Sequence, residues 1–189
     1  DRLSEALTRA VSIGVKAGPP VDLSSTPHAP LLWLTGSGGL DLPPAQRESL
    51  RKYLADGGTL FADSAWGRPA FAEAVEAMLV ELFGRDAVKP LSPDSPLLSG
   101  DVAGGMGSDL RKVAYSRHVA EEVRAAGEPV LKCLELNGRV AAVLSPYGVT
   151  CPMAGLPAFG CQGLSQADAL RLAANVVYYA FAPGSAARR

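Results

Sequence analysis

Several features that would point to a specific biochemistry are scarce in this chain. It has three cysteines, at positions 133, 151 and 161, and no C-x-x-C pair, which excludes a disulfide-rich scaffold and gives no zinc signature. Its 18 basic and 19 acidic residues nearly cancel, so we expect no nucleic-acid partner. The apolar run Val176–Ala182 is far shorter than the roughly 20 residues that span a bilayer, so we expect no membrane span.

The composition is otherwise that of a folded protein. Hydrophobic residues make up 48% of the 189 residues and charged residues 20%, which excludes global disorder. A chain of this length most simply forms one domain, so we expect residues 1–189 to be a single α/β unit. Cys151 and Cys161 fall in one loop-like stretch. They either pair in an oxidising compartment or remain half-buried thiols.

Strands and helices alternate in the first half, which predicts a mostly parallel sheet with right-handed crossovers. Period and turn signals predict strands over Ser12–Ala17, Leu31–Leu34, Thr59–Ala62, Ala87–Leu91 and Lys112–Ser116. They predict one helix containing Leu3, Leu7 and Ala10 and one that starts near Pro43-Pro44 and ends before Gly57 as its C′ residue. Further helices are predicted over Phe71–Leu82, over Glu121–Ala126 and from a capping box at Ser165 to Ala180. The glycine- and proline-rich stretches 92–110 and 146–163 are expected to be long loops.

A hairpin signal stands in the second half. Two apolar runs, Val130–Leu136 and Arg139–Ser145, flank Asn137-Gly138. This dipeptide readily takes the positive φ angles of a two-residue turn. We therefore expect an antiparallel hairpin added to the parallel sheet.

The stretch Tyr53–Ser64 places a candidate site. A helix ends, two glycines turn the chain, and a buried strand runs out into the polar pair Asp63-Ser64. Open α/β sheets bind ligands at the carboxyl ends of their strands. Asp63 and Ser64 are therefore expected at a crevice.

Taken together, these stretches resemble an uncharacterised bacterial family, domain of unknown function 4159. The resemblance rests on Leu31–Gly36, Leu50–Ser64, Leu91–Pro96, Leu136–Ser145 with Cys151, and Asp168–Ala180. That family is related in fold to class I glutamine amidotransferases and ThuA-like proteins. The resemblance implies a flavodoxin-like three-layer sandwich in an exported or periplasmic protein, with a cytoplasmic one as the alternative. It implies no established activity.

Ser64 has an enzymatic interpretation, because amidotransferase folds place their nucleophile just after a central strand. A serine nucleophile needs a base within hydrogen-bonding reach. The chain has only His28 and His118, and the loop from Pro146 to Gly163 contains no His, Glu or Asp. The alternative is that Asp63 and Ser64 cap a helix or brace a turn.

Cofactor and metal signals are weak. Glycines in Thr35–Gly39 could expose amides to a phosphate or flavin, but Pro43 and Pro44 remove two amide donors from the following helix start. No second carboxylate accompanies Asp63 at a spacing that would hold a hard cation. We expect neither a cofactor nor a metal.

The sequence favours a non-catalytic module of the cell envelope that binds a protein partner or a small ligand. Its candidate crevice consists of Thr35, Ser37, Asp63, Ser64, Trp66, Ser145 and Tyr147. The alternative is a hydrolase or transferase that uses Asp63 or Ser64. A third possibility is a homo-oligomer assembled through the loop 92–110.

Overall fold

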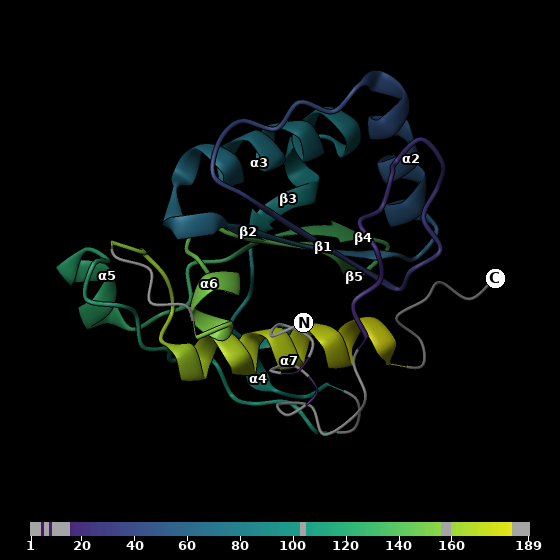
Figure 1. Cartoon of the computed structure of the whole chain (residues 1–189). Coiled ribbons are helices and arrows are strands. Elements are labelled where there is room, and N and C mark those ends of the chain that lie inside the picture. Colours follow the sequence, from purple (N-terminus) through teal and green to yellow (C-terminus); the bar gives the residue numbers. More distant parts are fainter. Residues whose placement is uncertain (1–4, 6–7, 9–15, 103–104, 156–159, 183–189) are drawn as a thin grey trace.

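The computed structural model describes residues 5, 8, 16–102, 105–155 and 160–182. In this part of the chain, helices cover both faces of a five-stranded sheet (Figure 1). The strands are β1 (Leu31–Gly36), β2 (Thr59–Ser64), β3 (Val88–Pro90), β4 (Lys132–Leu136) and β5 (Arg139–Ser145). The helices are α2 (Pro44–Ala55), α3 (Pro69–Phe83), α4 (Pro96–Ser99), α5 (Glu121–Ala126), α6 (Thr150–Met153) and α7 (Gln166–Phe181), with 3-10 turns η1 (Ala65–Gly67) and η2 (Arg85–Ala87).

The sheet is mixed and mostly parallel. Its strand order is β1-β2-β5-β4-β3, with β1, β2 and β5 parallel to one another. Strand β4 is antiparallel to both of its neighbours, so β3 again points the same way as β5. The predicted parallel sheet with an added antiparallel hairpin is confirmed at this level. Its assignment to the flavodoxin-like class stays a prediction.

Two apolar clusters, one on each face, make the structure three layers deep. Helices α2 and α3 lie on one side of the sheet, and α4, α6 and α7 lie on the other (Figure 1). The first cluster includes Leu54 and Leu79, and the second includes Leu172. Within β2, Phe61 belongs to the second cluster and Ala62 to the first, because successive strand side chains point to opposite faces.

Local signals placed most element boundaries correctly. Helix α2 starts at Pro44, and α3 ends before Gly84, whose φ is 89°. Helix α7 is capped as predicted: Asp168 N donates to the Ser165 hydroxyl. Asn137, with φ of 51°, leads the turn between β4 and β5.

Other predictions were wrong or lie outside the described residues. Lys112–Ser116 is not a strand. It forms one isolated bridge, Tyr115 with Leu164, because its amides and carbonyls bond to loops and not to the sheet. The helix predicted with Leu3, Leu7 and Ala10, and the strand predicted from Ser12, fall outside the described residues. Lys16 and Ala17, at the end of that strand, are irregular. Two short helices, α4 and α6, lie in stretches predicted as loops.

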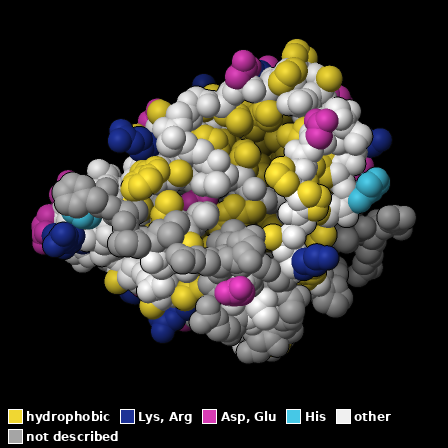
Figure 2. All heavy atoms as spheres, in the orientation of Figure 1, with side chains coloured by type: hydrophobic (Ala, Val, Ile, Leu, Met, Phe, Trp, Pro, Cys, Tyr) yellow, Lys and Arg dark blue, Asp and Glu magenta, His cyan; other side chains and the backbone are white. Residues whose placement is uncertain are grey.

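The two edge strands of this sheet, β1 and β3, differ in length and charge. Strand β3 is three residues long, contains Pro90, and carries an ion pair between Lys89 and Glu135 of β4 at 2.5 Å. Strand β1, in contrast, has no charged residue, and its four leading apolar side chains are all half-buried. On the face of the molecule that Figure 2 shows, hydrophobic side chains gather in a hollow, in the region where Figure 1 places β1, α2 and α3.

Candidate functional site

The topology places a switch point between the carboxyl ends of β2 and β5, because their chains leave the sheet on opposite faces. Strand β2 leads into α3 on one face, whereas β5 leads into α6 and α7 on the other. Neighbouring parallel strands whose chains leave on opposite faces open a crevice at their ends. The register brings Thr35 of β1, Asp63 of β2 and Ser145 of β5 into one row. The sequence therefore placed these three residues at the same edge correctly.

Asp63 lies at this switch point and does not face the solvent. It is fully buried, and its carboxylate accepts four hydrogen bonds. Oδ2 accepts from Val149 N and Thr150 N, both at 2.9 Å, while Oδ1 accepts from the Thr150 hydroxyl at 2.7 Å and from Trp33 Nε1 at 3.3 Å. A carboxylate at the first turn of a helix satisfies amides that have no intrahelical partner. Asp63 thus fixes the start of α6 to the end of β2.

Trp33 and Thr150 complete this buried network. The indole Nε1 also donates to Thr150 Oγ1 at 2.9 Å, so three side chains from β1, β2 and α6 share their hydrogen bonds. The Trp33 ring packs on Phe61 with ring centroids 4.5 Å apart. Neither Trp33 nor Thr150 was among the predicted site residues. Both were missed because they meet Asp63 only through pairings 30 and 87 residues apart in the chain.

Ser64 is fully buried as well, and its hydroxyl has no hydrogen-bond partner in the described part of the chain. Neither His28 nor His118 therefore lies within reach of the hydroxyl to act as its base. Ser145 is also buried, and its Oγ donates to Tyr147 O at 2.7 Å. Ser145 thus shapes the turn that leaves β5.

Four of the seven predicted residues are accessible at this edge of the sheet. Thr35, Ser37 and Trp66 are exposed, and Tyr147 is half-buried. Trp66 has 46% of its surface exposed and a φ of 64°, a left-handed conformation that is unusual for a bulky residue. Its carbonyl accepts from Gln162 N, which ties it to the loop before α7. The chain thus holds an exposed indole in a strained backbone conformation.

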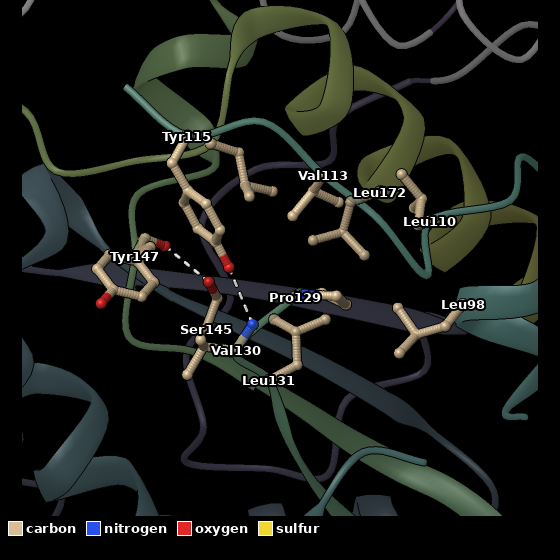
Figure 3. Close-up of a pocket in the computed structure, with 11 residues that line it drawn as sticks. Leu98, Leu110, Val113, Tyr115, Pro129, Val130, Leu131, Ser145, Tyr147 and Leu172 are labelled. Atoms are coloured by element: carbon tan, nitrogen blue, oxygen red, sulfur yellow. Dashed lines mark hydrogen bonds between the residues drawn. The ribbon is translucent and has the colours of Figure 1, made fainter. Parts of the chain in front are cut away.

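The cavity beside Tyr147 is small. Figure 3 shows Tyr115 and Tyr147 at one end of it and aliphatic side chains at the other. The rings of Tyr115 and Tyr147 meet edge-to-face at 5.2 Å, and burial raises the pKa of Tyr115 to about 12. The volume of the cavity is about 10 Å³. That is room for about one water molecule and not for a substrate.

The thiols and carboxylates offer little further chemistry here. Cys133, Cys151 and Cys161 are all free thiols, and burial raises the pKa of Cys161. A raised pKa keeps a thiol protonated and unreactive. Across the described ranges, no group of three His, Cys, Asp or Glu side chains could hold a metal ion. None of the described helices is long and apolar enough to cross a membrane.

Comparison with known proteins identifies the family. The family model described as "Domain of unknown function (DUF4159)" matches residues 1–181, which is nearly the whole chain. The chain belongs to the DUF4159 family. No curated protein matches it. The family resemblance inferred from the sequence is therefore confirmed, while the relationship of this DUF4159 chain to glutamine amidotransferases stays a prediction.

Proposed function

We propose that this DUF4159 chain is a non-catalytic module of the bacterial cell envelope that binds at the carboxyl ends of β1, β2 and β5. Its accessible surface there consists of Thr35, Ser37, Trp66 and Tyr147. The buried residues beneath, Asp63, Ser64 and Ser145, would shape and support this surface without contacting the ligand.

The exposed Trp66 carries the proposal. Nearly half of the surface of this indole is in water. Burying that apolar surface against a partner would gain hydrophobic free energy. Its left-handed backbone conformation costs about 1–2 kcal/mol. Strain of this kind persists where the surrounding structure fixes it, and such positions cluster at functional sites. Aromatic residues are also enriched in protein interfaces.

A protein partner suits this surface better than a small ligand. Tyr147 and Ser145 border a cavity with room for about one water molecule. Small-molecule sites usually offer several hundred Å³. An exposed aromatic residue is instead typical of a contact with another protein.

The buried pair supports a structural role over a hydrolase or transferase. All four hydrogen bonds of Asp63 lead to groups of this same chain, which keeps its carboxylate from acting on a substrate. Ser64 is enclosed and has no base beside it. The geometry therefore gives the enzymatic alternative neither a base nor an accessible nucleophile.

Site-specific photo-crosslinking in the native bacterium would test the proposal. A photoreactive residue is placed at position 66 or at the exposed control position Asp86, which lies in η2 just before β3, at the opposite end of the sheet from Trp66. We expect a discrete adduct from position 66 only. The partner so captured, once purified, should bind Trp66→Ala at least tenfold more weakly than wild type. Equal adducts from both positions, or unchanged affinity of Trp66→Ala, would contradict the proposal.

A further inference from the structure

A second concave region lies at the opposite end of the sheet from Trp66. It is a groove of about 590 Å³ beside the start of β5, between β3, β4, the end of α7 and the segment 91–102. Arg139 and Val140 line it at the beginning of β5, whereas Ser145 ends that strand at the other site. A volume of this size suits a small organic ligand.

The floor of the groove is apolar. Leu91, Val102, Cys133 and Val140 line it together with the Tyr179 ring. The first three are less than 10% exposed and belong to the core cluster on the α7 side, so they form a fixed surface. Such a floor would bind a hydrocarbon stem, and the Tyr179 ring could also contact a cation.

The charge of the lining is negative. Asp94 and Asp101 line the groove on exposed loop positions, and neither forms an ion pair within the described residues. Arg111 interacts with the charge of Asp94, but its guanidinium is paired with Asp109. The carboxyl end of α7 adds partial negative charge, because Ala182 also borders the groove.

The lining also holds two cations, Lys89 and Arg139. Lys89 is paired with Glu135 at 2.5 Å. Arg139 Nη2 donates to the carbonyls of Leu54, at the end of α2, and of Gly58, in the turn before β2, whereas its Nη1 is buried without a hydrogen-bond partner. The three carboxylates Asp94, Asp101 and Glu135 outnumber these two cations, so the lining carries a net charge of −1.

Ser95 supplies an independent sign of a ligand. It lines the groove, is only 8% exposed, and its hydroxyl has no hydrogen-bond partner in the described structure. An enclosed hydroxyl without a partner lowers stability, so a native structure that retains one calls for an explanation. The hydroxyl oxygen is enclosed, so an ammonium group in the groove could use it as an acceptor once the Ser95 side chain turns toward the groove.

From these features we propose that the groove binds a small organic cation: an ammonium or guanidinium group on an apolar stem. The stem would lie on the floor formed by Leu91, Val102 and Val140, and the charged group would face Asp94, Asp101 and Ser95. This site is separate from the surface around Trp66, so either proposal can fail without the other.

Three probes with six carbon atoms each test the charge preference. Amide shifts of the isotope-labelled full chain are followed by NMR during titration with n-hexylamine, 1-hexanol or hexanoate. We expect n-hexylamine to bind most tightly and hexanoate least, with shifts concentrated at residues 91–102 and 133–140. A capped Ala-Ala-Arg-Ala peptide is titrated in parallel. Tighter binding of the peptide than of n-hexylamine would identify a protein side chain as the source of the cation.

Variants test the residues. Asp94→Asn and Asp101→Asn should each weaken n-hexylamine binding roughly two- to fivefold, as expected for partly exposed ion pairs. Ser95→Ala should weaken it without lowering the melting temperature. Glu48→Gln is the matched control, because Glu48 pairs with Arg51 on α2, and it should bind as wild type does. The proposal is overturned if the three probes bind equally, if hexanoate binds best, if no shift occurs in the groove, or if both aspartate variants bind like wild type.

Discussion

Replacing Asp63 by asparagine should destabilise the protein by about 2–3 kcal/mol. The side chain keeps its shape but loses its charge, and a hydrogen bond to a charged group is worth roughly 1 kcal/mol more than one to a neutral group. The amide oxygen can still accept from Val149 N and Thr150 N, so these two bonds account for about 2 kcal/mol. The amide nitrogen would face the Trp33 Nε1 donor, which adds a further loss. For a chain of this length the melting temperature should fall by about 5–10 °C.

Urea unfolding followed by circular dichroism measures this effect. Asp41→Asn is the matched control, since Asp41 is exposed in a loop, and it should change stability by less than about 0.5 kcal/mol. A double-mutant cycle with Thr150→Val should give a coupling of about 1 kcal/mol or more, because the two side chains bond directly at 2.7 Å. Wild-type stability of Asp63→Asn, or a coupling near zero, would refute the claim that Asp63 holds α6 in place.

Three further predictions concern the scaffold. Gly67→Ala should lower the urea midpoint by the equivalent of about 2 kcal/mol or more, since φ is 67° and an added Cβ would lie 1.9 Å from Gln162 O, whereas Gly38→Ala meets open space and should be nearly neutral. Asn175→Asp should cost about 3 kcal/mol in the same assay, because the buried amide of Asn175 donates to two carbonyls at 2.8 Å that a carboxylate would repel. Burial raises the pKa of Tyr53 to about 12, so the stability that its protonated hydroxyl contributes is complete below pH 10 and is lost as the pH rises toward 12. The urea midpoint of Tyr53→Phe should therefore fall less steeply than that of wild type over this pH range. An unchanged slope would contradict this assignment.

Local sequence signals predicted the secondary structure well where they depended on nearby residues. The proline start of α2, the cap at Ser165 and the turn at Asn137 each depend on a few neighbouring residues, so they can be predicted from the local sequence. The mixed sheet also followed from the alternation of elements and the hairpin. Position at the strand ends was predictable for Asp63 because a buried apolar strand precedes it.

What the sequence could not supply was the partner of each polar side chain. Asp63 was expected in an open crevice and is instead enclosed, because the loop after β5 folds over the end of β2 and presents two amides to it. Helix α6 has only four residues and contains Pro152, so it carries no periodic signal. The groove near Ser95 was missed because β3, β4 and the end of α7 meet there from three distant parts of the chain.

The difference in length and charge between the edge strands β1 and β3 has a consequence for how copies of this protein would associate. Growth of a sheet by main-chain pairing needs a strand long enough to offer several amides and free of charges that a newcomer would have to desolvate. Strand β3 meets neither condition, whereas Leu31–Gly36 meets both. Of the two edge strands in the described part of the chain, β1 is therefore the one at which strand-to-strand polymerisation should begin, whether in a physiological assembly or during misfolding at high concentration, and a lysine introduced there would be the simplest way to block it.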